Sequence, residues 1–282
     1  MSFLEVENVS KFFLEPNGQS LCVFKTVRLH IEKGQFVTMV GHSGCGKSTL
    51  LNIIAGLETA SAGAIILDGK ETDTAGLDRM VVFQNFSLLP WMSVYENIRL
   101  AVRAAYPQWD RGKVHDYVQR YVNMVGLSES EHKKPAALSG GMRQRVGLAR
   151  AFAVQPKVLL LDEPFAQIDA LTRGAIQDEL MRMWTATKNT VFMVTHDVEE
   201  AILLSDKIAL MTSGPAAELA EIVDVKFPRP RLREELTELP EYARIKKHII
   251  QFLKNCVREQ PASDTTTGVD AVAVGQQLAA EV

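Results

Sequence analysis

The sequence predicts an α/β fold in which helices flank a largely parallel sheet, and three observations support this prediction. Residues 36–40 form a short apolar run that leads through a glycine-rich loop into the helical spacing of residues 48–57. Helical spacing then dominates from about residue 93 to residue 134. In the second half, apolar runs at 158–161 and 190–194 alternate with helical stretches. Strands that alternate with helices along a chain are typical of a parallel sheet.

The first forty residues indicate strands. Residues 3–9 alternate between apolar and polar side chains, and residues 21–31 mix apolar and basic ones. Both segments are rich in β-forming residues. We expect them to frame the glycine-rich loop that residues 36–40 enter.

That loop, Gly-His-Ser-Gly-Cys-Gly-Lys-Ser-Thr, fits the phosphate-loop pattern G-x-x-x-x-G-K-[ST]. Its glycines let backbone N–H groups turn toward phosphates, and Lys47 neutralises the β and γ oxygens. Ser48 is placed to bind Mg²⁺ and Thr49 a phosphate. A glycine-rich turn with a capping serine is the alternative, but a strand before the loop and a helix after it favour the nucleotide. The side chains of His42 and Cys45 are expected to shape the loop rather than to bind a metal or take part in redox chemistry. The predicted nucleotide ligands in this loop are Gly41, Ser43, Gly44, Cys45, Gly46, Lys47, Ser48 and Thr49.

The middle of the chain predicts a helical insertion. Apolar residues recur there at intervals of mostly three or four: Val94, Ile98, Leu100 and Val102, then Val114, Val118, Val122 and Val125. Next, Ser139, Gly140 and Gly141 precede a helix expected to reach Ala153. Small residues at a helix start expose N–H groups and the positive dipole end, which can hold a phosphate.

The apolar run 158–161 ends in Asp162 and Glu163. A carboxylate at the end of a buried strand is costly unless it has a partner, and Mg²⁺ would supply one at Asp162. A plain turn is the alternative, which the apolar run and Pro164 disfavour. Helices are then expected at 171–185 and from residue 198.

The composition narrows the class of protein. The 282 residues, 46% hydrophobic, can bury an ordinary core, and the net charge of −3 gives no basic field for sequence-independent nucleic acid binding. The three cysteines lack the spacing of metal ligands, and we expect no secretory leader. Both observations indicate that the protein resides in the reducing cytoplasm. No apolar run approaches the roughly eighteen residues that cross a bilayer.

Three stretches in one order, the phosphate loop, Leu-Ser-Gly-Gly-Met-Arg-Gln at 138–144 and Leu-Leu-Asp-Glu-Pro at 160–164, resemble the ATP-binding-cassette (ABC) ATPase family. The resemblance implies an α/β P-loop ABC-type nucleotide-binding domain that binds ATP and Mg²⁺, with an N-terminal antiparallel β subdomain. It also implies an ATPase core at 1–92 and 155–215, a helical subdomain at 93–154 and an extension at 216–258. Residues 259–282 are expected to form a flexible tail because they carry little large apolar surface.

The resemblance also implies roles for individual residues. Glu163 polarises the attacking water, His196 contacts the γ-phosphate, and Gln84 reaches Mg²⁺ and the water. His196 could instead be structural, but its place after the strand 190–194 favours the switch role. Gln84 could be an ordinary loop residue, but the apolar residues 88–91 after it indicate a docking surface for a membrane partner.

Further implied roles concern the adenine and the dimer. Phe13 stacks on adenine, with Phe12 as the alternative. Ser139, Gly140, Gly141 and Asp169 face the phosphate loop of a second ATPase subunit, so that two ATP molecules are bound head to tail. Gln167 differs from the residue that the family usually has in the loop before Asp169. Its side chain either enters the interface between the two subunits or points to solvent.

The strings at 86–91, 162–165 and 194–201 resemble the bacterial importer group for nitrate, bicarbonate, cyanate, sulfonates and taurine. The resemblance implies nitrate first and bicarbonate next, with multi-span permease subunits and a periplasmic or lipoprotein solute-binding protein as partners and no nucleic acid. The expected place is the cytoplasmic face of the inner membrane, where the chain is peripheral. The alternative is a soluble ABC ATPase that remodels a protein or nucleic acid complex.

Overall fold

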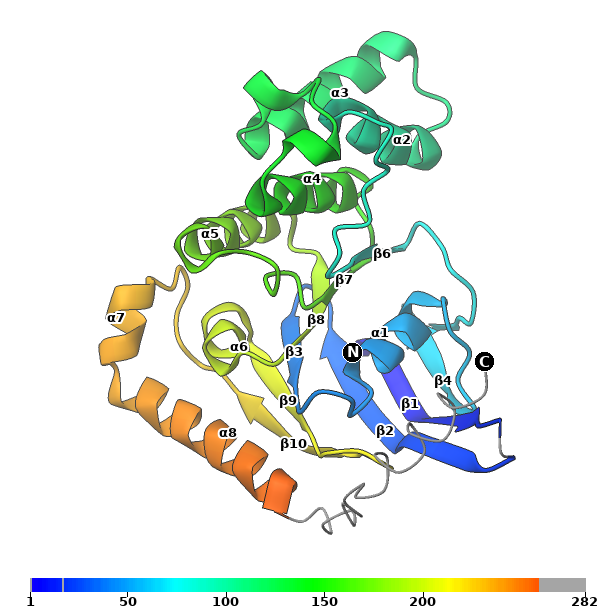
Figure 1. The fold of residues 1–282 in the computed structure, drawn as a ribbon, viewed down its shortest axis with the longest axis vertical. Coiled ribbons are helices and arrows are strands. Elements are labelled where there is room, and N and C mark those ends of the chain that lie inside the picture. Colours follow the sequence, from blue (N-terminus) through cyan, green and yellow to red (C-terminus); the bar gives the residue numbers. More distant parts are fainter. Residues whose placement is uncertain (1, 17, 259–282) are drawn as a thin grey trace, which may run out of the picture.

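A computed structural model describes residues 2–16 and 18–258 of the chain. Figure 1 shows a central sheet with a second, N-terminal sheet beside it, and the helices of residues 94–153 lie together at one end. The last helices run along the opposite edge. The predicted tail at 259–282 lies outside the described residues.

The N-terminal sheet has the strand order β2-β1-β4-β5 and is antiparallel. Its strands are β1 (Ser2–Leu14), β2 (Ser20–Glu32), β4 (Ala62–Leu67) and β5 (Lys70–Glu71). The first two are longer than the segments 3–9 and 21–31 that the sequence indicated, because their ladder continues to the pair Leu14 and Ser20.

The core sheet has the strand order β10-β9-β3-β8-β7-β6. Its strands are β3 (Phe36–Val40), β6 (Arg79–Val82), β7 (Val158–Asp162), β8 (Thr190–Thr195), β9 (Lys207–Met211) and β10 (Leu219–Asp224). All neighbours are parallel except β10, which runs antiparallel to β9. Because β10 pairs here, the core sheet continues past residue 215 into the predicted extension. The other domain bounds stay a prediction.

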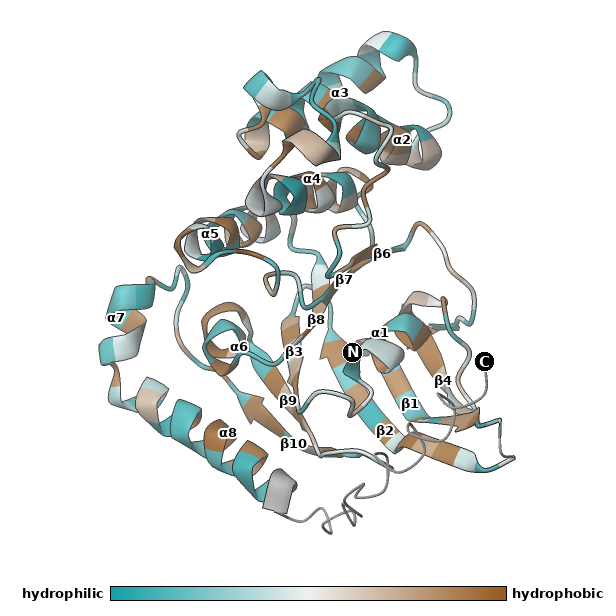
Figure 2. Cartoon of the chain, in the orientation of Figure 1, coloured by the Kyte–Doolittle hydropathy of each residue, from teal (hydrophilic) through white to brown (hydrophobic). Residues whose placement is uncertain are grey.

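Each face of the core sheet packs on its own hydrophobic core. Side chains alternate along a strand, so Leu159 and Leu161 of β7 face one core while Val158 and Leu160 face the other. The first core includes α5 (Ala170–Thr187) and α6 (Val198–Leu204). The second includes α1 (Lys47–Ala55) and the N-terminal sheet. Figure 2 shows the apolar strands enclosed between these layers, with polar residues on the outer helices.

The helical subdomain contains α2 (Val94–Ala105), α3 (Arg111–Met124) and α4 (Gly140–Ala153), with single 3₁₀ turns at Ser128–Ser130 and Pro135–Ala137. Ser93 and Glu96 form a capping box that fixes the start of α2. The predicted apolar spacing is confirmed for seven of the eight residues, which are buried. Leu100 is the exception and is 46% exposed, because it lies on the opposite face of α2 from Ile98 and Val102.

The C-terminal part contains α7 (Arg233–Glu238) and α8 (Pro240–Arg258). Residues 242–253 have the amphipathic spacing that indicates a short helix, and they lie within α8, whereas no helix was predicted at α7. The segment before them contains Pro228 and Pro230 and is anchored by Arg231. Nη1 of Arg231 donates to the carbonyl oxygens of Ile202 at 2.9 Å and Ser205 at 2.7 Å. This contact satisfies carbonyls that the end of α6 leaves without helical partners. No helix in the described ranges is both long and apolar enough to cross a membrane.

Candidate functional site

Four loops of the core sheet meet at one edge. Strands β3, β8, β7 and β6 are consecutive neighbours and run parallel, so their C-terminal ends lie on the same side. Ligands of open α/β sheets bind outside these ends. The strand ends and the loops that follow carry, in that strand order, the glycine-rich residues, His196, Asp162 with Glu163, and Gln84. The topology therefore gathers side chains that lie far apart in the sequence.

Two glycines of the loop adopt a conformation that other residues avoid. Gly44 has φ 80° and Gly46 has φ 97°, both in the left-handed region. A Cβ atom on Gly46 would also lie 2.7 Å from side-chain atoms of both Val23 and Phe24. The backbone at this point can therefore approach β2 only if residue 46 is glycine.

The loop ends in a helix start suited to an anion. Helix α1 begins at Lys47 with no side-chain capping bond, so its first N–H groups are available for phosphate oxygens. The Lys47 side chain is buried, and its Nζ donates to the carbonyl oxygens of Gly41 at 2.9 Å and His42 at 2.8 Å. A positive charge thus lies inside the loop, where phosphates would need it.

The side chains of His42 and Cys45 contribute to packing. Cys45 is fully buried, and burial raises the pKa of its thiol, which keeps it protonated. Nε2 of His42 lies 2.8 Å from the carbonyl oxygen of Leu253 in α8.

The predicted metal ligands Ser48 and Asp162 lie together. The Ser48 hydroxyl donates to Oδ1 of Asp162 at 2.7 Å, although 114 positions separate them. Burial raises the pKa of Asp162, and the nearby Glu163 adds to this effect, while the Ser48 bond acts against it. A hydroxyl and a desolvated carboxylate are hard oxygen donors of the kind that Mg²⁺ takes.

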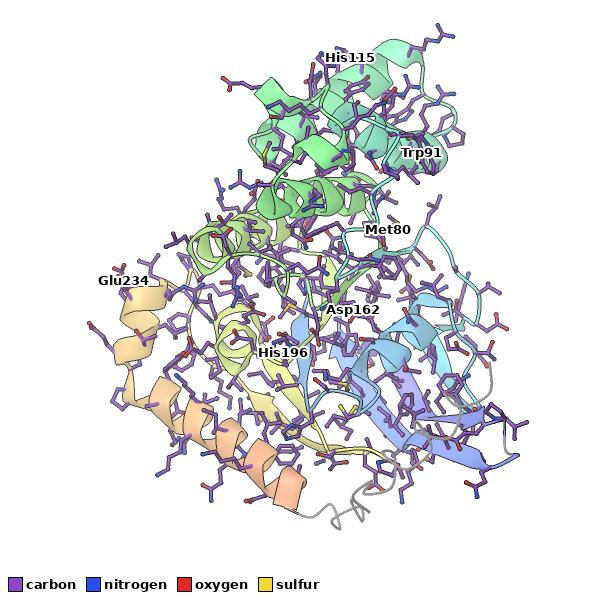
Figure 3. The ribbon with its side chains drawn as sticks, in the orientation of Figure 1. Met80, Trp91, His115, Asp162, His196 and Glu234 are labelled. Carbon is purple, nitrogen blue, oxygen red and sulfur yellow. The ribbon has the colours of Figure 1, made fainter. Side chains whose placement is uncertain are left out.

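Glu163 is held in a position that its backbone does not favour. Its φ is 43°, in the left-handed region, and its N–H donates to the carbonyl oxygen of Val194 in β8 at 3.0 Å. Oε2 of Glu163 lies 3.2 Å from Nδ1 of His196. Figure 3 shows Asp162 and His196 close to the centre of the molecule, at the edge described above. The structure therefore brings together the two residues for which the sequence predicted roles at the γ-phosphate.

Gln84 lies in the loop after β6, and its side chain is exposed. Of the two phenylalanines, Phe12 is 42% and Phe13 is 41% exposed, so exposure does not choose between them. Neighbouring strand residues point to opposite faces, so only one of them can stack on a base bound at this site. Nζ of Lys11 lies 4.7 Å from the ring centroid of Phe13.

The remaining predicted ligands lie elsewhere in the chain. Ser139 is the N-cap of α4 and accepts from the N–H of Met142 at 3.2 Å. Asp169 is the N-cap of α5 and accepts from the N–H and the hydroxyl of Thr172, both at 2.9 Å, and these bonds lower its pKa. In Figure 1 helix α4 lies with α2 and α3, apart from α1 and the glycine-rich loop. The stretch at 138–144, which we call the signature, therefore lies apart from the glycine-rich loop of the same chain.

The two signature glycines pack tightly against the segment that follows Glu163. A Cβ atom on Gly140 would lie 3.1 Å from the carbonyl oxygen of Gln167, and one on Gly141 would lie 2.7 Å from Cγ2 of Thr172. These contacts require small residues at both positions. Gln167 is exposed in the single chain.

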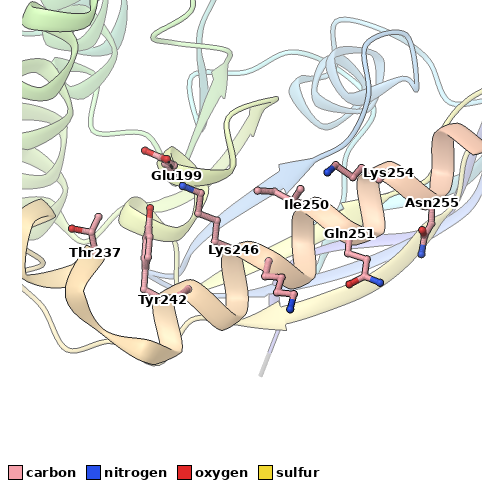
Figure 4. A pocket seen from close by; sticks show the side chains of 10 residues that line it. Glu199, Thr237, Tyr242, Lys246, Ile250, Gln251, Lys254 and Asn255 are labelled. Carbon is pink, nitrogen blue, oxygen red and sulfur yellow. Dashed lines mark hydrogen bonds and ion pairs between the residues drawn. The ribbon is translucent and has the colours of Figure 1, made fainter.

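The sequence reasoning missed the contacts of α8 with this site. Besides the bond to His42, α8 reaches α6 through Lys246, whose Nζ lies 2.6 Å from Oε1 of Glu199. A groove of about 730 Å³ runs along this face of α8, and Figure 4 shows Tyr242 and Ile250 among its lining side chains. Helix α8 thus contacts both the glycine-rich loop and the helix after His196. The amphipathic spacing of 242–253 showed that one face would be covered but not by what.

Comparisons with known proteins identify the family of the chain. The family model described as ABC transporter matches residues 24–166. The bicarbonate transport ATP-binding protein CmpD of Synechococcus elongatus is 48% identical over 253 residues, which are 90% of this chain and 91% of that protein. The nitrate import ATP-binding protein NrtD of the same organism is 45% identical over 251 residues, 89% of this chain and 91% of that protein. The dimeric structure of MJ0796, a bacterial ABC transporter cassette, aligns with a TM-score of 0.72 and 29% identity, covering 80% of this chain and 100% of that chain.

Proposed function

Because the chain belongs to the ABC transporter family of ATP-binding proteins, we propose that it hydrolyses ATP to energise the import of a small anion across a bacterial membrane. The observation that carries this proposal is the edge of the core sheet, where Ser48 contacts Asp162 and Glu163 contacts His196. Phosphate-binding, metal-binding and water-activating groups thus lie together at the C-terminal ends of β3, β8 and β7, which are consecutive strands of the core sheet.

The residues fit a Mg²⁺ ion bound with ATP. Ser48 and Asp162 would hold it, and Gln84 would join them from the loop after β6. When bound, Mg²⁺ neutralises the charge on the phosphate oxygens. The hydroxyl of Ser48 already points at the Asp162 carboxylate, so the two donors need little rearrangement.

The hydrolysis itself falls to Glu163, His196 and Lys47. Glu163 orients the attacking water and accepts its proton, while His196 keeps the carboxylate in place through Nδ1. Lys47 donates to phosphate oxygens in place of the carbonyls of Gly41 and His42. Phe13, or Phe12 as the alternative, stacks on the adenine.

A second copy of an ABC ATPase completes each site. Ser139 and Asp169, the N-caps of α4 and α5, are exposed, and α4 lies apart from this chain's own phosphate loop. In a head-to-tail dimer, Ser139, Gly140 and Gly141 of one chain would face the γ-phosphate on the other. The dimeric structure of MJ0796 supports the pairing of two such chains.

The partners follow from import. Leu89, Pro90 and Trp91 form an apolar surface after Gln84, and Trp91 is 64% exposed. This surface would dock a multi-span permease, and the chain would then lie at the cytoplasmic face of the inner membrane. A periplasmic or lipoprotein solute-binding protein would deliver the anion, so the solute never contacts this chain.

Nitrate stays the first candidate anion and bicarbonate the second, and relatives that carry each name are about equally similar, at 45% and 48% identity. The test is uptake of labelled nitrate and, separately, labelled bicarbonate by the source cells, with the native chain replaced by Lys47→Ala. We expect one of the two fluxes to fall to background. Unchanged uptake of both anions, with the variant present at normal level, would contradict the import function.

A further inference from the structure

We propose that Arg150 is a positioning residue that fastens the loop after Gln84 to the signature helix α4. The apolar surface around Trp91 and the residues Ser139 to Gly141 would then move as one rigid body. The role of this body in the ATPase reaction does not depend on the permease. Only its role in transport rests on the proposed function.

The loop contains a turn that its residues do not favour. Phe86 has φ 64° and Ser87 has φ 43°, two consecutive left-handed residues of which neither is glycine. A Cβ atom makes this conformation costly, so surrounding contacts must impose it. Phe86 is buried, with only 5% of its surface exposed, which leaves the turn no freedom to relax outward.

Arg150 supplies the contacts that impose the turn. Its Nη1 donates to the carbonyl oxygen of Ser87 at 2.8 Å, and its Nη2 donates to that of Phe86 at 3.3 Å. Within the described residues it forms no salt bridge, and its planar fork is directed to these two carbonyls. The guanidinium carbon of Arg143, also in α4, lies 5.2 Å from the centroid of the Phe86 ring.

The far end of the loop is fastened to α2 in a similar way. The side chain of Asn97 is buried, with 1% of the residue exposed, and it accepts from the N–H of Leu89 at 2.9 Å. Its amide nitrogen donates to the carbonyls of Leu89, Met92 and Ser93 at 3.3, 3.1 and 2.9 Å. Helices α2 and α4 pack on each other. Residues 86–93 are therefore fixed to the helical subdomain at both ends.

Residues 83–85 are then the flexible connection between the core sheet and the helical subdomain. Gln84 and Asn85 are exposed and connect β6 to the fixed turn. Arg150 lies ten positions after Gly140, about 15 Å along the same helix. A displacement of Trp91 would reach the signature residues through Arg150 and α4, while Gln84 adjusts between the subdomain and the core sheet.

The test compares ATP turnover and ATP affinity of the full chain for four variants. In Arg150→Ala we expect kcat to fall at least tenfold while the dissociation constant for ATP, measured on the isolated chain, stays within twofold. Arg150→Lys, which keeps one donor, should recover part of the loss. The double variant Arg150→Ala with Ser87→Gly should have a kcat at least threefold higher than that of Arg150→Ala, because glycine adopts the required φ without the arginine contacts. The exposed Arg103→Ala in α2 is the matched control and should leave kcat unchanged.

A fifth variant changes the turn itself and leaves α4 unchanged. Ser87→Val places a β-branched side chain on a residue with φ 43° and should lower kcat as Arg150→Ala does, at unchanged ATP affinity. An unchanged kcat in both Arg150→Ala and Ser87→Val would overturn the proposal. A loss in Arg150→Ala that Ser87→Gly does not recover would also overturn it, because a merely structural arginine predicts no rescue. Failure of the import function would appear in anion uptake and leave these ATPase results in place.

Discussion

Glu200, behind the switch histidine, gives a prediction whose magnitude the structure supplies. The residue is 5% exposed and accepts from the hydroxyl of Thr195 at 3.0 Å and from the amide of Gln177 at 3.1 Å. Burial, followed by repulsion from Asp197, raises the pKa of its carboxyl from 4.5 to about 7. We consider the variant Glu200→Gln, which has nearly the same shape and cannot ionise.

The sign follows from comparing the folded and unfolded chains. Below pH 4.5 the carboxyl is protonated in both states, so it has no effect on stability. As pH rises toward 7 the unfolded chain loses this proton first, and the folded state is progressively disfavoured. Above pH 7 the full cost applies, about 3 kcal/mol. The glutamine variant should therefore exceed the native chain in unfolding free energy by about 1 kcal/mol at pH 5 and about 3 kcal/mol at pH 8.

The measurement is urea unfolding followed by tryptophan fluorescence at pH 5, 6.5 and 8. The matched control is Glu199→Gln at the neighbouring position, where the side chain is 52% exposed and forms a surface salt bridge with Lys246. Exposed pairs contribute under about 1 kcal/mol, so this control should change little at any pH. A Glu200→Gln variant whose advantage does not grow with pH, or that is less stable than the native chain at pH 8, would refute the reasoning.

Further predictions concern the phosphate loop and the signature. Lys47→Ala should lower phosphate release from ATP by about a hundredfold or more, because it removes the cation that stabilises the charged phosphates; near-native release would contradict the loop assignment. Gly141→Ala should lower the unfolding free energy by about 1 kcal/mol, since overpacking against Thr172 exceeds the gain in helix propensity. Its control, Gly174→Ala in α5, has no atom within 4 Å of the added carbon and should raise the unfolding free energy by up to about 1 kcal/mol. If both alanines change stability in the same direction, the packing argument for Gly141 is wrong.

Much of the core fold follows from local sequence patterns. The strands β3, β7 and β8 are continuous apolar runs, and such runs are typical of strands that are buried on both faces. The end of α1 follows from Gly56, which adopts φ 73° after the last helical residue. The motifs predicted Ser48 and Asp162 as ligands of one Mg²⁺ ion, and the structure places their side chains 2.7 Å apart because Ser48 lies in the first turn of α1 and Asp162 ends β7.

Other features depend on contacts that no local pattern records. The segment that forms β10 has mostly exposed side chains and becomes a strand because β9 offers it a partner. Leu100 shares the apolar character of its neighbours but lies on the wrong face of α2 to be buried. Arg150 stands inside an otherwise apolar stretch of α4, which signals a buried charge, although only the structure shows that its partners are the carbonyls of Phe86 and Ser87.

The central claim is that one chain carries half of each ATP site and that ATP joins two chains. The most direct measurement is gel filtration of Glu163→Gln, which should bind ATP and fail to hydrolyse it. With Mg-ATP we expect the variant to elute at twice the 31.3 kDa of the chain, and with Mg-ADP at the mass of one chain. A variant that stays a single chain in Mg-ATP and still releases phosphate at the native rate would contradict both the shared site and the role of Glu163.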